Sequence, residues 1–219
     1  MQHRVVCLAT GPYLTTWADC IATHRPYCDR HLYRYDLIDR ETGPLHAKWQ
    51  KLAHCRDALE AGSGHILLID ADARINPPAP PFHVVVDAMP EADILCVLGR
   101  SGRPNSGMIM FRGGAGSVAA KFLAACIDAR DTAVPPEDFV TAEGENGHFI
   151  HFLKREPFAS RLGLLPLTWN NTRPPPSPAD YVTHYAGKPM RMILPPDHPG
   201  YRPPKIKGAK ARRMAPTAS

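Results

Sequence analysis

The sequence predicts an α/β fold in which helices flank a mostly parallel central sheet. Short apolar runs alternate along the chain with segments of helical periodicity, which is the pattern of a layered α/β protein. Residues 66–69 are apolar at four successive positions, as expected for a parallel strand that is covered on both faces. The chain has 219 residues, 44% of them hydrophobic, which is enough for one domain with its own core.

Each element follows from local signals. The first apolar run, residues 4–10, ends at Gly11 and Pro12 and predicts the first buried strand. Residues 46–62 have helical spacing, with Gly62 at the position of a C-terminal capping glycine. After the strand at 66–69, we expect in order strands at 92–99 and 106–112, helices at 116–130 and 143–156, and short closing strands at 162–169 and 181–187.

The chain divides into a domain over residues 1–203 and a flexible basic tail at 204–219. The formal charge is +5, from 26 basic and 21 acidic residues, and much of the excess lies in the tail. The body has no basic face with interleaved aromatic residues, so nucleic acid is not an expected partner. The tail either keeps the chain end soluble or makes a peripheral contact with an anionic membrane surface.

The cysteine spacing and the hydropathy of the chain indicate the cellular compartment in which the protein is expected. The six cysteines are scattered without a Cys-x-x-Cys pair, so neither a disulfide framework nor a zinc site is expected. Cys7 and Cys96 lie in apolar runs, where cysteine acts as a small buried hydrophobe. No stretch approaches the roughly 20 apolar residues of a membrane span, and no signal-type cleavage site is visible. We therefore expect a soluble, cytoplasmic protein.

Two aspartates follow the strand at 66–69 directly. Asp70 and Asp72 are one residue apart, and such carboxylates repel each other unless an arginine, a metal ion or bulk water lies between them. Ligands of open α/β sheets bind beyond the carboxyl ends of strands, and a spacing of two lets both side chains face one cation. Oxygen ligands favour Mg²⁺ or Mn²⁺ over zinc. The alternative is a solvated turn, helped by Asn76 and Pro77.

A second polar cluster lies far downstream, at His184, Gly187 and Lys188. A neutral imidazole can act as a third metal ligand. The glycine lets the backbone approach a ligand closely, and the lysine can neutralise phosphate. Taken alone, these residues favour a surface loop over a ligand site.

Several motifs together resemble metal-dependent GT-A glycosyltransferases. The likeness is closest to retaining galactosyl- and mannosyltransferases of the yeast Golgi α-mannosyltransferase type, and more distant to glycogenin-like enzymes. It covers most of residues 4–190 and implies a single GT-A, Rossmann-like catalytic domain. The segments that carry it, in chain order, are "YCDRHLYRY", "KWQKLAHCRDAL", "LLIDADARI", "NSGMIMFR", "ENGHFIHFL" and "HYAGKP".

The resemblance implies a set of ligand contacts. Asp70, Asp72 and His184 would hold Mn²⁺ (or Mg²⁺), with Asp70 sharing the metal or contacting the ribose, and Lys188 would contact the diphosphate. The other implied donor-binding residues are Ala9, Thr10 and Tyr13 for the base, Lys51 and Ala71 beside the donor, Asn105, Ser106 and Gly107 around the floor under the sugar, and Gly187 next to Lys188. Other interpretations remain for some of them. Lys51 suits a solvated helix face equally well, and Asn105 and Gly107 are ordinary residues for a turn that opens a strand.

Glu145 is the residue we expect to carry the chemistry. It shares a helix face with Phe149, Phe152 and Leu153, so it should point inward, and a buried acid is more plausible at a site than by accident. The resemblance places Glu145 and Asn146 beside the anomeric carbon, as nucleophile, ion-pair stabiliser or hydrogen-bond acceptor. The alternatives are an N-terminal glutamate favoured by the helix dipole, or the same role for Glu143.

The function implied by the resemblance is that of a hexosyltransferase. The donor would be a nucleotide-diphosphate sugar, with a UDP-sugar favoured, the acceptor a saccharide, a glycolipid or other lipid-linked molecule, or a small molecule, and the anomeric configuration would be retained. The sequence departs from the family in "GKPMRM", which has no tryptophan, and we expect no membrane anchor. The alternatives are a catalytically silent scaffold that binds nucleotide or sugar, and a sugar-nucleotide pyrophosphorylase. The pyrophosphorylase is disfavoured because "ATGPYLTTWAD" has one glycine and no lysine.

Overall fold

The central feature is a six-stranded sheet with the order β2-β1-β3-β6-β5-β7. The computed structural model describes residues 1–140 and 144–204 of the chain. All strands of the sheet run in one direction except β6, which is antiparallel to both β3 and β5. The expected α/β architecture with a mostly parallel sheet is confirmed. The strands are β1 (Arg4–Leu8), β2 (Arg34–Ile38), β3 (Ile66–Asp70), β5 (Ile94–Leu98), β6 (Pro104–Phe111) and β7 (Leu162–Leu164).

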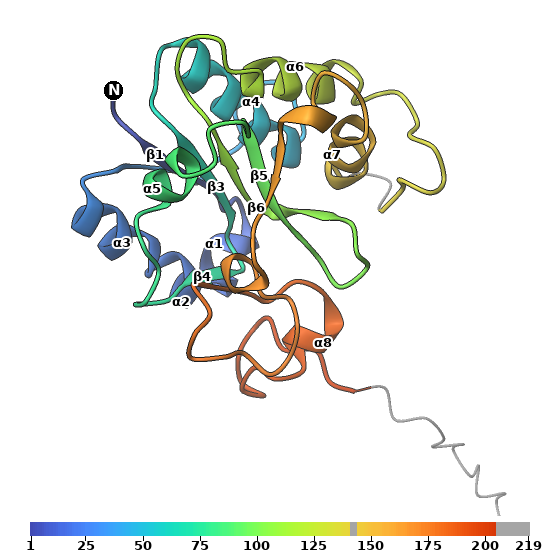
Figure 1. Ribbon diagram of the computed structural model, residues 1–219. Coiled ribbons are helices and arrows are strands. Elements are labelled where there is room, and N and C mark those ends of the chain that lie inside the picture. The colour runs from blue at the N-terminus through green and yellow to red at the C-terminus, as the bar shows by residue number, and fades with distance from the viewer. Residues whose placement is uncertain (141–143, 205–219) are drawn as a thin grey trace, which may run out of the picture.

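Helices cover both faces of this sheet (Figure 1). Successive residues of β3 alternate between two cores, so Ile66 and Leu68 pack on one face while Leu67 and Ile69 pack on the other. All four are fully buried, which confirms a strand covered on both sides. The first face is covered by α4 (Ala47–Glu60), α6 (Ala119–Asp128) and α7 (Asn146–Leu153), and the second by α1 (Pro12–Thr16), α2 (Ala18–Ile21), α3 (His24–His31) and α5 (Phe82–Asp87).

A second, two-stranded sheet follows the carboxyl end of β3. In it β4 (Ala73–Ile75) pairs antiparallel with β8 (Val182–His184), in a register that sets Ala73 opposite His184. The short helix α8 (Gly187–Arg191) comes next in the chain and lies with β4 at the lower part of the molecule in Figure 1. This pairing brings His184 to the turn that carries the two aspartates.

Some sequence-based predictions need correction. The helix predicted at 46–62 is α4, and Gly62 has the positive φ of 82° expected after its end. The strand predicted at 162–169 is wrong beyond Leu164, because Pro166 has no N–H for a sheet and the chain turns into the 3-10 helix η2 (Leu167–Trp169). The elements that the sequence pattern missed are β2, β4, α1, α2, α3, α5, α8 and the 3-10 helix η1 (Ala159–Arg161).

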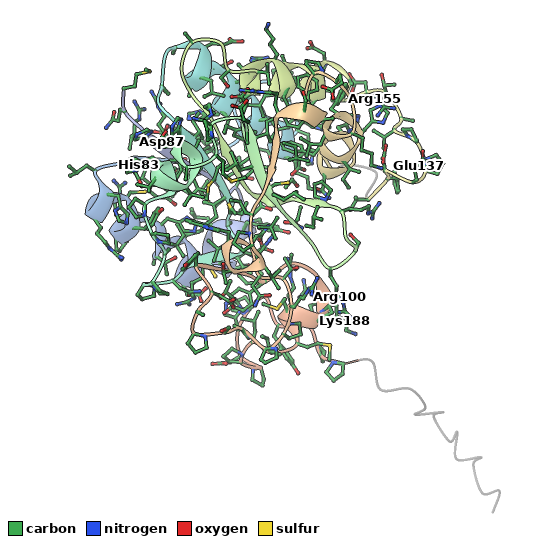
Figure 2. All side chains as sticks on the ribbon, viewed as in Figure 1. His83, Asp87, Arg100, Glu137, Arg155 and Lys188 are labelled. Atoms are coloured by element: carbon green, nitrogen blue, oxygen red, sulfur yellow. The ribbon has the colours of Figure 1, made fainter. Side chains whose placement is uncertain are left out.

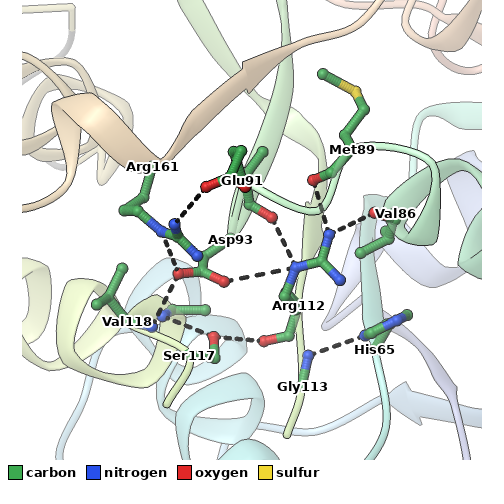
Figure 3. Close-up of polar contacts among 12 residues, drawn as sticks. His65, Val86, Met89, Glu91, Asp93, Arg112, Gly113, Ser117, Val118 and Arg161 are labelled. Atoms are coloured by element: carbon green, nitrogen blue, oxygen red, sulfur yellow. Dashed lines mark hydrogen bonds and ion pairs between the residues drawn. The ribbon is translucent and has the colours of Figure 1, made fainter.

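At the end of the sheet opposite to the aspartate turn, a buried carboxylate joins several elements (Figure 3). Asp93 is 1% exposed and its Oδ2 accepts from Arg161 Nε at 2.9 Å and from Val118 N at 3.3 Å. Arg112 lies 3.5 Å from Asp93 Oδ1 and donates to the carbonyls of Met89 and Ala92. These contacts fasten the ends of β5 and β6 to the loop after α5 and to the start of α6.

Three further expectations concern cysteines, membrane segments and the tail. All six cysteines are buried with free thiols, and Cys7 and Cys96 are buried in strands as predicted. Within residues 1–140 and 144–204, no helix combines the length and the apolar character needed to cross a bilayer. The proposed basic tail, apart from Pro204, lies outside the described residues.

A buried histidine makes stability depend on pH. His24 is fully buried; its Nε2 donates to the Ala73 carbonyl at 2.8 Å and its Nδ1 lies 3.1 Å from the Tyr35 hydroxyl. Burial lowers the pKa of His24 from 6.5 to about 4, although the bond to Ala73 acts in the opposite direction. The unfolded chain therefore binds a proton between about pH 6.5 and pH 4 that the folded chain does not, and folding weakens as the pH falls through this window.

We predict that His24→Gln flattens this dependence. The contribution of His24 to the free energy of unfolding should fall by about 3 kcal/mol between pH 7 and pH 4. Urea unfolding of both proteins across this range measures it, with the exposed His46→Gln as the matched control. An unchanged pH slope in His24→Gln would contradict the assignment.

Candidate active site

The two aspartates stand at the carboxyl end of β3. Asp70 is the last residue of that strand, and Asp72 lies in the two-residue turn before β4. The side chain of Asp72 is only 10% exposed, and its carbonyl accepts from Tyr185 N at 2.8 Å. The interpretation of this segment as a solvated surface turn is therefore wrong.

Asp70, Asp72 and His184 form a group that fits a divalent cation. Each offers one ligand atom, and these atoms lie within 4.8 Å of one another. Asp72 Oδ1 and His184 Nε2 are 3.2 Å apart, close to the roughly 3 Å between neighbouring donors of one octahedral ion. Carboxylate and imidazole donors suit Mn²⁺ and related ions. The sequence-predicted metal residues are thus brought together.

Two basic side chains also contact these aspartates. Lys51 Nζ donates to Asp70 Oδ1 at 2.6 Å and lies 2.8 Å from Glu145 Oε1. Arg191 Nη2 donates to Asp72 Oδ2 at 2.9 Å, and its guanidinium lies over the Trp17 ring at 5.1 Å. Three carboxylates thus meet two permanent cations, and the excess negative charge favours a bound metal ion.

The electrostatics keep these groups charged. Burial alone would raise the pKa of Asp72, but His184 and Arg191 lower it to about 2. Burial would likewise lower the pKa of Lys51, yet Asp70 and Glu145 raise it above its ordinary value. Against its own burial, the Glu145 carboxyl has a lowered pKa because Lys51 lies beside it. Asp72, Glu145 and Lys51 are therefore ionised at neutral pH, whereas burial raises the pKa of Asp70 even though Lys51 beside it acts in the opposite direction.

Glu145 points inward, as its helical spacing predicted. It is the N-cap residue of α7 rather than part of the helix, and it is 5% exposed. Ser106 Oγ donates to Glu145 Oε1 at 3.0 Å, and Ser106 N donates to Asn146 Oδ1 at 2.8 Å. Lys51 is 3% exposed, so the solvated-lysine interpretation is wrong. Glu143, the alternative acid, lies outside the described residues.

A cavity of about 430 Å³ opens over this cluster. The predicted residues that line it are Thr10, Tyr13, Lys51, Asp70, Ala71, Asp72, Ser106, Glu145 and Asn146. The sequence analysis did not single out Leu8, Glu41, His46, Ala47, Lys48 and Gly144, which also line it. Lys48 precedes Lys51 by three residues on α4, so helical spacing could have indicated it.

Other predicted residues lie elsewhere. Ala9 is fully buried and is not part of the cavity lining. Asn105 Oδ1 accepts from Gly107 N at 3.0 Å, and both residues lie within β6, which begins at Pro104, so their interpretation as a turn that opens the strand is wrong. Gly187 and Lys188 line a separate cavity of about 510 Å³ with Arg191, Arg202 and Pro203. Figure 2 shows Lys188 at the edge of the molecule, far from His83 and Asp87 on α5.

Gly107 makes room for the histidine. A Cβ at this position would lie 2.0 Å from His184 Cε1 and 2.8 Å from each ring nitrogen. The imidazole therefore rests with its Cε1 edge on the glycine, while the two nitrogens point to either side. The glycine thus supports the predicted metal ligand.

Comparison with known proteins adds the fold relationship. No family model and no curated protein matches the sequence. A glycosyltransferase involved in glycosylation of the major capsid of PBCV-1 has a similar structure, with a TM-score of 0.66 and 15% identity over 85% of this chain and 95% of that one. The glycosyltransferase GlyE of Streptococcus pneumoniae TIGR4, in its apo form, gives a TM-score of 0.56 and 11% identity over 86% of this chain and 55% of GlyE.

These likenesses show a shared fold. They agree with the expected GT-A-like architecture, and the chain spans about half the length of GlyE. The more specific resemblance to the yeast α-mannosyltransferase type stays a prediction.

The Lys51 bridge gives a test by mutation. Lys51→Met leaves Asp70 and Glu145 without their shared cation, so the free energy of unfolding should fall by about 3 kcal/mol. Adding Glu145→Gln should recover part of the lost free energy of unfolding, because it removes one of the two buried carboxylates that no longer have a cationic partner. Chemical denaturation measures both variants. The neighbouring Lys48→Met should stay within about 0.5 kcal/mol of the unaltered protein, and an equal loss at both lysines would refute the bridge.

Proposed function

We propose that this protein is a metal-dependent glycosyltransferase that moves a hexose from a nucleotide-diphosphate sugar to an acceptor. The observation that carries the proposal is the grouping of Asp70, Asp72 and His184 beside a cavity, in a fold shared with known glycosyltransferases. Buried charged groups that are held in place are typical of catalytic cavities, and the buried Lys51, Asp72 and Glu145 beside this cavity support the proposal.

Each part of the cavity has a proposed task. Asp70, Asp72 and His184 would hold Mn²⁺ or Mg²⁺, which as a Lewis acid takes up charge from the leaving diphosphate. Thr10 and Tyr13 would receive the base. Tyr13 is 51% exposed where it lines the cavity, so its ring is available for stacking. Arg191, which contacts Asp72, would add positive charge near the phosphates, and Lys188 would do so only from the neighbouring cavity that it lines with Arg191.

The donor sugar would lie against Glu145. Its carboxylate is ionised and held by Lys51 and Ser106, so it can stabilise the positive charge that develops at the anomeric carbon. Since these contacts already orient Glu145, we propose that it acts as an ion-pair stabiliser. Asn146 and Lys51 would keep it in position, and transfer would proceed with retention.

The partners follow from the same proposal. We infer a UDP-sugar as the donor and a saccharide, lipid-linked or small-molecule acceptor, with the reaction in the cytoplasm. The PBCV-1 enzyme takes part in glycosylation of a capsid protein, which makes a protein-linked saccharide one acceptor to include. Contact of the tail with the inner membrane face would suit a lipid-linked acceptor.

One observation favours a second candidate, a binding scaffold without turnover. Lys51 contacts Asp70 and Arg191 contacts Asp72. Such ion pairs can stabilise a carboxylate cluster that has no metal. A scaffold would bind the nucleotide sugar and leave it intact.

Release of the nucleotide diphosphate tests the proposal. UDP- and GDP-hexoses are incubated with the protein and Mn²⁺, and the free diphosphate is measured with and without a chelator. We expect release only with metal, and a loss of 10²-fold or more in Asp72→Asn, since its charge holds the cation. The exposed Asp128→Asn should retain full activity. Binding without release from any donor would favour the scaffold, and activity that survives both the chelator and Asp72→Asn would contradict the proposed metal site.

A further inference from the structure

We propose that Asn105 and Asn170 are positioning residues that keep a proton on Nδ1 of His184 and thereby present its Nε2 to the metal. The inference rests on the proposed metal-dependent function. It follows from a continuous chain of hydrogen bonds that starts at the backbone N–H of Gly107, which can act only as a donor. Neither asparagine lines the cavity of about 430 Å³, so both act through His184.

The chain starts at the N–H of Gly107 on β6. A backbone N–H can only donate, and its acceptor is Asn105 Oδ1 at 3.0 Å. This bond identifies the atom as the amide oxygen and so fixes the orientation of the Asn105 side chain. The same oxygen lies 3.0 Å from Asn170 Nδ2.

The second step fixes Asn170. Facing an acceptor, this side chain must present its NH₂ group to Asn105, so its oxygen faces the other way. That oxygen is 2.9 Å from His184 Nδ1. Asn170 is fully buried, so bulk water does not compete for it. Among residues 1–140 and 144–204, the donor that reaches this oxygen is Nδ1–H of His184.

The third step follows from the imidazole itself. A neutral histidine carries one proton, and with this proton on Nδ1 the Nε2 lone pair faces Asp72 Oδ1 at 3.2 Å. Their lone pairs repel at this separation unless a positive group lies between them. That group is either a bound cation or, in the metal-free protein, a second proton on Nε2, which the Asp72 carboxylate favours by raising the pKa of His184 against the effect of burial. The ring cannot swing away through Gly107, because its Cε1 edge already fills the space of a Cβ there. The geometry therefore holds Nε2 ready for a cation, as outer hydrogen bonds do for histidine ligands in metal sites generally.

The variants separate the acceptor role from packing. Asn170→Leu has a similar volume but accepts no hydrogen bond, whereas Asn170→Asp keeps an acceptor toward His184 and loses the donor toward Asn105. At position 105 only the oxygen takes part in the hydrogen-bond chain, so Asn105→Asp keeps both bonds and Asn105→Leu removes them. Thermal unfolding of each variant shows whether it is folded.

Two readouts test the inference on the full chain. Mn²⁺ alone is titrated and followed by the electron paramagnetic resonance signal of the free ion. We expect affinity 10- to 100-fold weaker in Asn170→Leu and Asn105→Leu, and within about threefold of the unaltered protein in Asn105→Asp, which keeps every bond of the chain. Long-range ¹⁵N–¹H correlation spectra of the metal-free protein with neutral His184 should show the Nδ1–H tautomer, and a mixture of tautomers in Asn170→Leu.

The outcomes distinguish the inference from the function on which it rests. An Nε2–H tautomer in the unaltered protein overturns the inference, even where the leucine variants fail to fold. Equal Mn²⁺ affinity in the unaltered protein and a folded Asn170→Leu also overturns it and leaves the metal site standing. Absence of Mn²⁺ binding by the unaltered protein overturns the metal-dependent function and, with it, the presentation of Nε2 to a metal.

Discussion

The repulsion between Asp70 and Asp72 is the constraint on which this site depends. Both carboxylates come from the end of one buried strand, so the chain itself cannot separate them. Distant elements supply the counter-charges instead: Lys51 comes from α4 and Arg191 from α8. The pairing of β4 with β8 adds His184 from a position 112 residues after Asp72. The tertiary fold therefore stabilises the two neighbouring carboxylates, which would repel each other in the isolated segment.

The Asp93 cluster at the other end of the sheet is a useful contrast. There, too, a buried carboxylate meets two arginines, Arg112 and Arg161, and the other carboxylates that these arginines contact, Asp87 and Glu91, are exposed. At the Asp70–Asp72 turn the negative charge is in excess and a cavity adjoins it. Buried ion pairs contribute little net stability, so excess charge beside a cavity indicates a ligand, whereas the Asp93 cluster fastens strand ends.

The sequence was informative where local pattern determines the outcome. The apolar run before Asp70 identified β3 and its carboxyl edge, and helical spacing predicted that Glu145 points inward. It could not reveal Asn170 or Arg191, because their importance arises only when β8 and α8 fold against the aspartate turn. Nor does spacing along α4 distinguish a buried Lys51 from a solvated one. The helices α1 and α2 were missed because five and four residues are too few to show a period, and β2 and α3 were missed because polar residues interrupt their apolar positions.

The central claim is that a divalent cation and a nucleotide diphosphate bind together at Asp70, Asp72 and His184. Calorimetric titration of UDP and GDP into the protein, each with and without Mn²⁺ and beside Asp72→Ala, tests it most directly. We expect one nucleotide to bind only when Mn²⁺ is present, and this binding to be lost in Asp72→Ala. Absence of binding by either nucleotide under all conditions, or binding that neither the metal nor Asp72 affects, would contradict the account.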